Sequence, residues 1–321
     1  MTLPVLCLMG PTASGKTALG VALAQALGGE IVSVDSALVY RGLDIGTAKP
    51  THAEQGGIEH HLLDICDPAE PYSAQQFFVD AMAAITAIHQ AGKLPILVGG
   101  TMLYFRSLLA PMAALPAADP ALRATLLESF ARAGGEAMHA RLSALDPVAA
   151  RGVHPHNRQR LVRALEVCLL TGQPISELWQ QQQCQPEAGV VTNQALGPVI
   201  QIGLWPQQRA SLHARIEQRF EAMLKAGFWE EVLALRARSD LPSDCPALRT
   251  VGYRQMWQHA AGELSWEDAH AAALAATRQL AKRQLTWLRR WQSLQCFDMM
   301  QEDLTAITLN WVKQTLKRYD S

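Results

Sequence analysis

The stretch LCLMGPTASGKTALG, residues 6–20, joins a short apolar run, a glycine-rich loop and the first turns of a helical pattern. Residues 10–17 match the pattern G-x-x-x-x-G-K-[S/T] at every fixed position. The two glycines permit a tight turn whose backbone N–H groups converge on phosphate oxygens, and the following helix directs the positive end of its dipole there. In such a loop Lys16 supplies a positive charge and the Thr17 hydroxyl a ligand for Mg²⁺. The stretch therefore predicts a phosphate-binding loop between a buried strand and a helix.

Strand and helix patterns alternate over the first 110 residues. Three apolar runs have the composition of buried strands, at residues 4–9, 30–36 and 94–100. Helical spacing covers residues 16–27, and Ser73 with Gln76 forms a capping box for a helix that ends near Ala91. Because strands and helices alternate, we predict a parallel α/β sheet that binds its ligand at the carboxyl edge.

The pattern changes after this region. Only helical patterns occur from Asp119 to about Gln183, and the next strand pattern is residues 198–206. Between them, residues 180–197 have the composition of a polar return linker. A helical tail follows, with helices expected at residues 207–226, 228–238 and 265–291.

We therefore divide the chain into three parts. Residues 1–117 are the first part of the α/β core, residues 118–190 are a helical insertion, and residues 191–321 complete the core and add C-terminal helices. The predicted fold class is α/β: a P-loop NTPase-like parallel sheet core with an all-helical insertion domain and a helical C-terminal region.

The composition is that of a water-soluble protein. Of 321 residues, 49% are hydrophobic and 18% charged, with a formal net charge of -1. The most apolar stretch, residues 95–115, is interrupted by glycines, Arg106 and Pro111, so it is a poor membrane span. The six cysteines are scattered and form no zinc-ligand spacing with the histidines, which predicts buried, reduced thiols. We expect a cytoplasmic protein that does not contact membranes.

The acidic residue that usually accompanies a phosphate loop is missing. NTPases hold Mg²⁺ with an Asp after a second buried strand, but here the run at 94–100 ends in glycines and Thr101. The other acid near a strand end is Asp35, which neutral residues follow. A phosphate loop beside one carboxylate indicates transfer chemistry in which the phosphates leave. Asp35 could equally cap its own strand by accepting hydrogen bonds from nearby backbone N–H groups.

Seven motifs, in order along nearly the whole chain, together resemble the tRNA dimethylallyltransferase (tRNA isopentenyltransferase) family. Without the Cys/His zinc finger of eukaryotic relatives, the chain resembles the bacterial form. The motifs are GPTASGKT (10–17), SVDSALVYRGLDIGTAKP (33–50), LVGGTMLYF (97–105), HPHNRQRLVRALEV (154–167), RIEQRF (215–220), RTVGYRQMW (249–257) and TRQLAKRQLTWLR (277–289).

The resemblance implies a reaction: transfer of a dimethylallyl group from dimethylallyl diphosphate to the N6 amine of the tRNA adenosine just 3′ of the anticodon. The loop that resembles an ATP-binding site would then hold the diphosphate of the prenyl donor, with Mg²⁺ on Thr17. The residues implied in diphosphate binding are Gly10, Pro11, Thr12, Ala13, Ser14, Gly15, Lys16 and Thr17.

The resemblance also assigns three catalytic residues. Asp35 is expected to be the general base, Thr101 to bond the acceptor adenine or its phosphate, and Arg219 to stabilise the departing diphosphate. Two structural alternatives remain open. Thr101 could be the N-cap of a helix, and Arg219 could lie on a solvated charged face that Glu217 and Glu221 share.

Two segments are basic without any acid. They are residues 151–163, with four arginines, and residues 278–290, with five basic residues and a tryptophan, Trp287, on which a base could stack. Solvated helix faces are the alternative reading. The tRNA contacts that the resemblance implies are Asp35, Ser36, Ala37, Leu38, Thr101, Arg123, Gln159, Arg160, Leu161, Val162, Arg163, Arg249, Thr250, Val251, Gly252, Tyr253, Arg254, Lys282, Arg283, Gln284, Leu285, Thr286, Trp287, Leu288 and Arg289.

Three other functions remain open at this point. The first is a P-loop small-molecule kinase, with the helical insertion as its lid. The second is an isopentenyltransferase that acts on free adenine nucleotides, and the third is an RNA-binding NTPase switch without transfer chemistry. For the preferred function we expect a monomer whose partners are the tRNA anticodon stem-loop, which the insertion would clasp, and dimethylallyl diphosphate.

Overall fold

The computed structural model describes residues 3–110, 115–183, 196–241 and 245–319. The chain divides into two compact units. Unit 1 consists of Met1–Ala110 with Gly189–Ser321, and unit 2 of Pro111–Ala188. The sequence placed the limits of the insertion a few residues further along, at 118 and 190. Most of the expected linker, residues 184–195, lies outside the described residues.

A six-stranded sheet, parallel throughout, forms the centre of unit 1. Its order is β3-β2-β4-β1-β5-β6. The strands are β1 (Val5–Met9), β2 (Gly29–Val34), β3 (His60–His61), β4 (Leu94–Gly99), β5 (Val199–Trp205) and β6 (Gln295–Asp298). The predicted fold class is confirmed, because a helical unit interrupts the sheet between β4 and β5.

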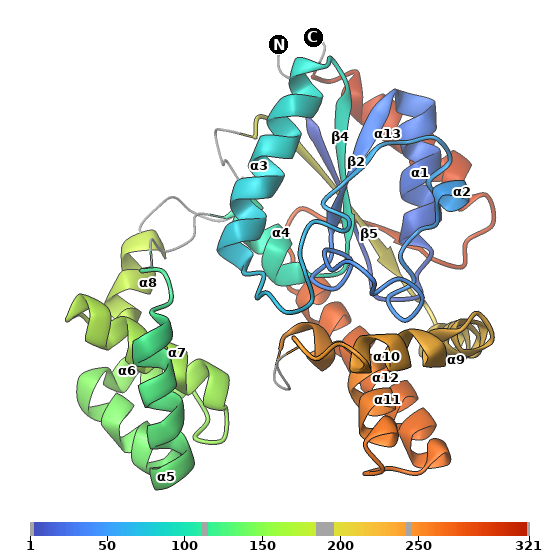
Figure 1. The fold of residues 1–321 in the computed structure, drawn as a ribbon. Coiled ribbons are helices and arrows are strands. Elements are labelled where there is room, and N and C mark those ends of the chain that lie inside the picture. Colours follow the sequence, from blue (N-terminus) through green and yellow to red (C-terminus); the bar gives the residue numbers. More distant parts are fainter. Residues whose placement is uncertain (1–2, 111–114, 184–195, 242–244, 320–321) are drawn as a thin grey trace. The chain divides into compact units, whose positions relative to one another are not determined.

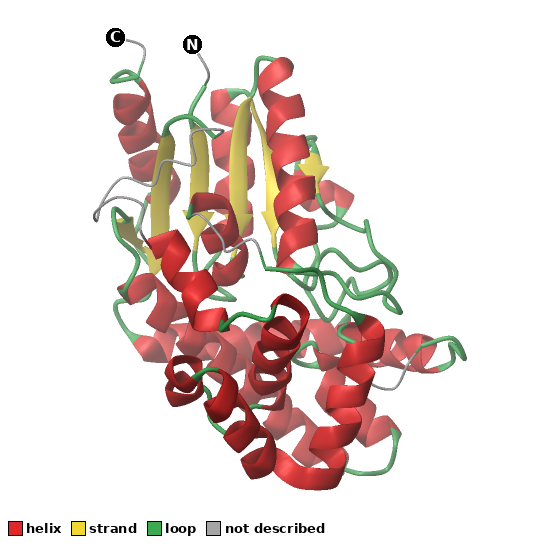
Figure 2. Ribbon diagram, turned by 90° about the vertical axis from the view of Figure 1, so that its left-hand side faces the viewer, coloured by secondary structure: helices red, strands yellow, loops and turns green. Residues whose placement is uncertain are grey.

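Helices cover both faces of the sheet, which is why its central strands are apolar at nearly every position. On one flank α1 (Lys16–Leu27) packs with α13 (Leu304–Leu316). On the other, α3 (Ala74–Gln90) packs with α4 (Met102–Leu109) (Figure 1). Figure 2 shows the strands side by side between these helices. All residues of β1 and β4 are buried, and these two strands meet the phosphate loop at their carboxyl ends.

Glycine is required where β4 ends beside β2. A Cβ on Gly99 would lie 2.0 Å from the carbonyl oxygen of Val34, its partner in the parallel register. Any side chain there would separate the two strands, and β2 leads directly into Asp35. The glycines that end the third apolar run therefore serve strand pairing as well as ligand access.

Four helices lie beyond the carboxyl ends of the strands in unit 1 (Figure 1). They are α9 (Arg209–Lys225), α10 (Phe228–Arg236), α11 (Tyr253–Ala260) and α12 (Trp266–Arg289), with a 3₁₀ turn at Ala247–Arg249. The starts and ends of α9, α10 and α12 fall within three residues of those of the three predicted tail helices. The additional helix α11 lies between α10 and α12 in the chain. A further short helix, α2 (His52–Gln55), follows the long connection after β2.

Two features of unit 1 differ from the sequence expectations. Cys296 is exposed at β6, so the prediction of six buried thiols is wrong for it, and Cys184 lies outside the described residues. The sequence also gave no sign of β6 or α13, which follow the last motif. Within the described ranges, no helix has the length and apolar character needed to cross a membrane.

Unit 2 contains only helices over its described residues, as the sequence predicted. They are α5 (Pro120–Leu145), α6 (Pro147–Gly152), α7 (Arg158–Thr171) and α8 (Ile175–Gln183). The long α5 is kinked at Gly134, whose φ of 80° no helix adopts. A separate core forms between α5 and α7, where Leu126, Leu142, Leu161 and Leu165 are fully or almost fully buried.

A buried carboxylate, Glu166, organises one end of this core. Its side chain has 0% exposure and accepts hydrogen bonds from Arg163 (2.7 Å), Arg123 (2.8 Å) and the backbone N–H of Asp119 (3.2 Å). Burial would raise the pKa of Glu166, but the bonds from Arg163 and Arg123 lower it overall. The carboxylate therefore stays charged and ties α5 to α7.

Replacing Glu166 with Ala is expected to loosen unit 2. The change leaves two guanidinium groups and one backbone N–H without their acceptor, a loss of about 2 kcal/mol for a charged hydrogen-bonded group. Hydrogen exchange of the α5 and α7 amides should accelerate. Glu128→Ala, which removes an exposed carboxylate of α5, is the control and should leave exchange unchanged. Equal exchange in both variants would contradict the role of Glu166.

Candidate active site

A cavity of about 140 Å³ lies in unit 1 at the carboxyl edge of the sheet. The phosphate loop, the residue after β2, α9 and α12 all contribute to its wall. The polar and charged side chains among these are Thr12, Lys16, Thr17, Asp35, Arg219, Thr277 and Gln284. Two loops, residues 46–48 and 250–252, complete the wall. Segments from opposite ends of the chain thus meet at the edge where the sequence predicted the ligand.

The phosphate loop has the tight turn that its glycines predicted. Gly15 has a φ of 86° and Ala13 a φ of 62°, both left-handed, and the Ser14 N–H donates to the Pro11 carbonyl (3.2 Å). The first N–H groups of α1 have no acceptor within the helix, because no turn precedes them. They are therefore available to an anion, which the helix dipole also favours.

Lys16 is half-buried and carries its charge in a partly desolvated environment. Its ammonium donates to the Pro11 carbonyl at 3.2 Å. Burial lowers the pKa of Lys16 to about 8, and the positive charge of Arg219 acts in the same direction, while the negative charge of Asp35 opposes both. An anion bound beside Lys16 would reverse this shift. The site is therefore short of negative charge.

Arg219 is a second cation in the same cavity. Its Nη2 donates to the carbonyl oxygen of Thr47 at 3.0 Å, and burial lowers its pKa. No carboxylate among the described residues forms an ion pair with it. One turn earlier on α9, the guanidinium of Arg215 lies beside the phosphate loop, since a Cβ on Gly15 would be 3.3 Å from its Nη2. Arg215 opens the motif RIEQRF, in which the resemblance gave a role only to Arg219.

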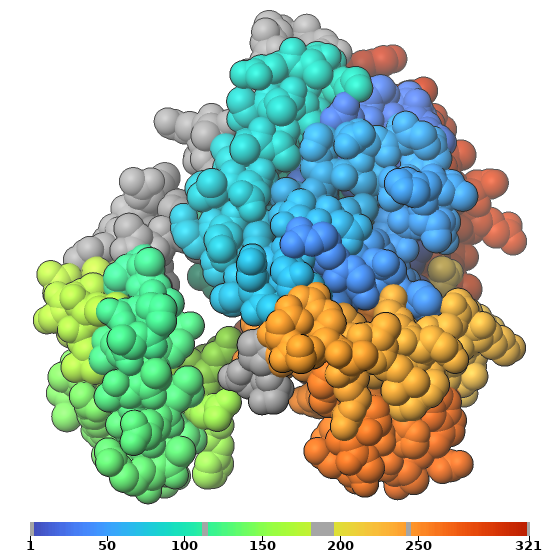
Figure 3. Space-filling view, in the orientation of Figure 1, coloured from blue at the N-terminus to red at the C-terminus, as the bar shows by residue number. Residues whose placement is uncertain are grey.

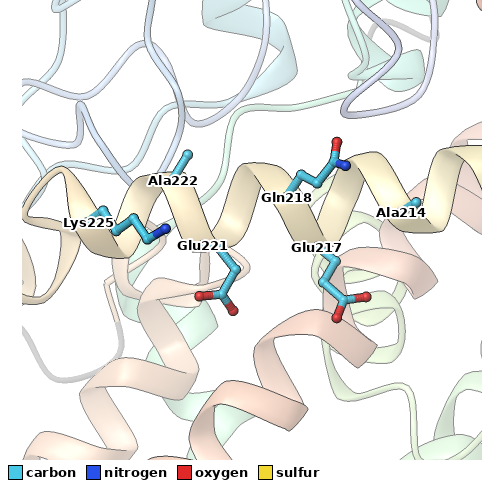
Figure 4. A pocket seen from close by; sticks show the side chains of 6 residues that line it. All are labelled: Ala214, Glu217, Gln218, Glu221, Ala222 and Lys225. Carbon is cyan, nitrogen blue, oxygen red and sulfur yellow. The ribbon is translucent and has the colours of Figure 1, made fainter.

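The acids that flank these arginines do not pair with them. Figure 4 shows Glu217 and Glu221 leaving α9 on the same side. There Glu221 bonds His270 (2.6 Å) and Glu217 lies 3.4 Å from Arg278, both on α12. A wide depression of about 490 Å³ follows this helix, but its lining comes from α9 alone, so it is an open face rather than a site. The alternative of one solvated face shared by the arginines and acids is wrong.

Asp35 makes a local capping bond and also lines the cavity. Its Oδ1 accepts the N–H of Ala37 at 2.9 Å, which is the local capping bond. The side chain is half-buried and lines the cavity. Among the contacts of the described residues, Oδ2 takes part in none, so one oxygen of the carboxylate remains for a ligand. The bond from Ala37 N–H therefore orients the carboxylate of Asp35 and uses only one of its two oxygens.

Thr101 begins α4 but does not cap it with its side chain. It stands at the N-cap position of α4, yet its side chain makes no capping bond. Its Oγ1 accepts the N–H of Ser36 at 3.1 Å and lies 3.4 Å from the Ser36 hydroxyl. The Thr101 N–H in turn donates to the carbonyl of Val34 (3.2 Å). Thr101 thus links the end of β4 to the residues on both sides of Asp35.

Gln284 has a role that the sequence did not indicate. It is buried on α12, its Oε1 accepts the N–H of Thr12 at 2.8 Å, and its Nε2 donates to the Gly100 carbonyl at 3.0 Å. One amide side chain thereby joins the phosphate loop to the end of β4. A Cβ on Gly100 would lie 2.4 Å from Nε2, so the glycine allows this approach. The sequence had grouped Gln284 with the tRNA contacts because it lies within a basic motif.

Ten of the proposed tRNA contacts are exposed. They are Ser36, Gln159, Arg160, Arg249, Arg254, Lys282, Arg283, Thr286, Trp287 and Arg289. Asp35, Ala37, Leu38, Thr250, Val251 and Gly252 line the cavity instead. Arg123 and Arg163 are half-buried and bonded to Glu166, which gives them a structural function in unit 2.

Five side chains of the same set face the interior, so contact with tRNA through them is excluded. Leu161 and Val162 belong to the core of unit 2, and Tyr253, Leu285 and Leu288 to the core of unit 1. The reason is helical periodicity: a continuous motif on a helix that packs against a core must direct part of its residues inward. Assigning every residue of a motif to the tRNA surface does not distinguish the buried face of the helix from its exposed face.

Replacing Gln284 with Leu should weaken the binding of inorganic diphosphate about tenfold, the effect of about 1.4 kcal/mol from two lost hydrogen bonds. The Leu side chain keeps the volume but leaves Thr12 N–H and the Gly100 carbonyl without partners. Gln201→Leu is the matched control, because Gln201 is also buried but bonds Trp291, away from the cavity. Equal losses in both variants would mean a general packing effect, and no loss in Gln284→Leu would remove it from the site.

The chain matches the family model for IPP transferase over residues 38–291. It is 52% identical over 308 residues to a tRNA dimethylallyltransferase from Chromohalobacter salexigens, which covers 96% of each chain. It is also similar to the full-length tRNA isopentenylpyrophosphate transferase structure from Bacillus halodurans, with a TM-score of 0.70 and 36% identity over 98% of this chain and 97% of that one.

A eukaryotic dimethylallyltransferase acting on tRNA also has this fold, with a TM-score of 0.79 and 26% identity over 98% of this chain and 78% of that one. The relatives thus match both the sheet with its phosphate loop and the interrupting helical unit. Together, the family match over most of the chain and the identity over nearly all of it show that this protein belongs to the IPP transferase family.

Proposed function

We propose that this protein transfers a dimethylallyl group from dimethylallyl diphosphate to the N6 amine of the tRNA adenosine just 3′ of the anticodon, and releases diphosphate. One observation carries the proposal: two half-buried cations, Lys16 and Arg219, share a cavity with a single carboxylate, Asp35, at a phosphate loop. The cavity wall needs only unit 1, which supports activity as a monomer.

The cations fit a leaving group that gains negative charge. As the allylic C–O bond breaks, charge accumulates on the diphosphate oxygens, while the allyl fragment becomes a delocalised cation. Lys16, Arg219 and the N–H groups at the start of α1 stand ready for this charge before the reaction begins. Preorganised donors of this kind contribute about 3 kcal/mol each to a reaction barrier. Arg215 adds a further positive charge beside Gly15.

Thr17 fits a magnesium ligand. Its side chain lines the cavity with Asp35, and among the described residues no three His, Cys, Asp or Glu side chains gather into a metal site. Mg²⁺ needs no such cluster, because it keeps several waters and binds through one or two protein oxygens plus substrate phosphates. When bound, Mg²⁺ neutralises charge on the departing diphosphate.

Asp35 is the proposed acceptor for the proton of the acceptor amine. Bond formation between N6 and the allylic carbon makes N6 positive, and the free Oδ2 of Asp35 takes one N6 proton. The hydroxyl groups of Thr101 and Ser36 lie 3.4 Å apart, and we propose that they bond the purine ring. The local bond from Ala37 N–H keeps the carboxylate facing the cavity during this step.

The exposed basic face of α12 supports tRNA as the acceptor. Lys282, Arg283 and Arg289 lie on it, with Trp287 among them, while Gln284 on the buried face of the same helix reaches the phosphate loop. Basic side chains track the RNA backbone and aromatic rings stack on bases. The target adenosine must leave its stack to reach Asp35, as in other enzymes that act on a base.

Incubation with dimethylallyl diphosphate, Mg²⁺ and unmodified tRNA should give N6-dimethylallyladenosine after nucleoside digestion. Asp35→Asn keeps the capping bond but cannot accept the proton, so its turnover should fall at least about a hundredfold, the usual contribution of a general base. Its tRNA affinity should be unchanged. Turnover of ATP without this nucleoside would instead favour the kinase, and near-normal activity of Asp35→Asn would exclude it as the base.

Donor binding should weaken above pH 8. Lys16 has a pKa of about 8 in the free site, and a bound diphosphate raises it, so binding takes up a proton above that pH. Affinity for a non-reactive thio analogue of the donor should then fall with pH, at most about tenfold per unit by linkage. Titration at pH 6.5 to 9.5 measures this. Lys16→Arg stays charged and should show no such decline; constant affinity of the parent protein would refute the assignment.

A further inference from the structure

We infer that Glu231 of α10 is a positioning residue for the diphosphate site. It fixes the loop of residues 44–49, which lies within the DIGTAKP part of the second motif, and through that loop it orients Arg219. The proposal deepens the proposed function and rests on Arg219 as a diphosphate ligand. Neither the motif nor the comparisons gave Glu231 a role.

Three consecutive N–H groups converge on this one carboxylate. Oε2 of Glu231 accepts the N–H groups of Asp44 (2.9 Å) and Ile45 (2.8 Å), and Oε1 accepts that of Gly46 (3.0 Å). The hydroxyl of Tyr253 also donates to Oε1. Successive backbone N–H groups of this kind form a concave anion site, here filled by the protein itself. The carboxylate of Glu231 thus holds the loop of residues 44–49 in place, although it lies far away in the sequence.

Close packing between the loop and α10 makes this arrangement possible. A Cβ on Gly46 would lie 2.0 Å from the ring of Phe228, so only glycine allows the backbone this near to α10. Phe228 is fully buried and packs edge-on against the ring of Tyr253, at 4.9 Å between centroids. In Figure 3 the blue atoms of the early loops lie directly on the orange atoms of this helical region.

The opposite side of the loop is fixed as well. The buried ammonium of Lys49 bonds the carboxylates of Asp44 (2.6 Å) and Asp64 (2.5 Å) and the carbonyl of Tyr40 (2.7 Å). The loop also closes on itself, since the Lys49 N–H donates to the Asp44 carbonyl (2.9 Å). Between the two anchors, residues 46–48 form part of the cavity wall.

The carbonyl of Thr47 transmits the position of the loop to Arg219. It accepts Nη2 of Arg219 at 3.0 Å, the only hydrogen bond this guanidinium makes to the described part of the chain. A single neutral acceptor orients the guanidinium and leaves its other N–H groups for an anion. If the loop lost its anchor, Arg219 would lose this constraint while keeping its charge. Glu231 thus acts on the diphosphate without touching it.

Glu231→Gln is the sharpest variant, because it keeps the shape of the side chain but places an amide NH₂ against backbone N–H donors. We expect its affinity for inorganic diphosphate, and its KM for the prenyl donor, to weaken about tenfold, whereas tRNA affinity changes less than about twofold. Glu230→Gln is the matched control: the same charge change on the adjacent, exposed residue of α10. Hydrogen exchange of residues 44–46 should rise only in Glu231→Gln.

A double-mutant cycle then tests whether Glu231 acts through Arg219. In an Arg219→Ala background, Glu231→Gln should cause no further loss of diphosphate affinity, since residues that act in series are not additive. Independent, multiplied losses would overturn the proposal, as would unchanged affinity in Glu231→Gln or equal losses for diphosphate and tRNA. If Glu231→Gln fails to fold, Tyr253→Phe removes one donor to the same carboxylate and should shift diphosphate affinity in the same direction.

The positioning role of Glu231 and the proposed function can fail separately. Inorganic diphosphate binding needs neither tRNA nor turnover, so it reports on Glu231 even if no prenylated nucleoside forms. Conversely, a protein that forms the nucleoside but shows no effect of Glu231→Gln keeps the proposed function and loses only the positioning role.

Discussion

Two positive charges in one partly desolvated cavity are the constraint on which the site depends. Removing a cation from water is costly, and Lys16 shows this cost as a depressed pKa. Asp35 offsets the charge of the two cations only in part. The phosphate loop and the start of α1 add further positive potential from the backbone. The cavity therefore has a positive potential, which favours the binding of an anion.

Such a site needs a rigid frame, because like charges would otherwise move apart. Two side chains from the last third of the chain provide it. Gln284 joins the phosphate loop to the end of β4, and Glu231 holds the loop that orients Arg219. Both act on backbone groups of the N-terminal region rather than on a ligand. The C-terminal helices therefore shape the site as well as covering it.

Local patterns predicted the local structure well. The limits of α1 and the capping box of α3 agree with the sequence because nearby residues determine them, Gly28 by a left-handed C-cap and Ser73 by its bonds to Gln76. The parallel sheet and the helical insertion also followed from periodicity and strand spacing. By contrast, β6 has only four residues, two of them exposed, so its composition carries no strand signal.

Contacts between distant residues could not be predicted in this way. In the sequence, Glu231 is one of two adjacent acids in the first turn of a helix. The favourable interaction of acids with the helix dipole is enough to account for both. Only the fold shows that Glu231, unlike Glu230, faces three N–H groups nearly two hundred residues away. The inward orientation of Tyr253 and Leu285 likewise depends on which face of each helix meets the core.

The strand order has a consequence for synthesis of the chain. Among the strands made first, β1 is an edge strand, because its other neighbour, β5, follows the whole of unit 2. At ~5–20 residues per second, an unpaired apolar strand would persist on the ribosome for roughly 5–20 s. Exposed edges of this kind invite pairing with other chains. The nascent protein thus passes through an aggregation-prone interval whose length is set by the inserted helices, and the pairing of β5 with β1 ends it.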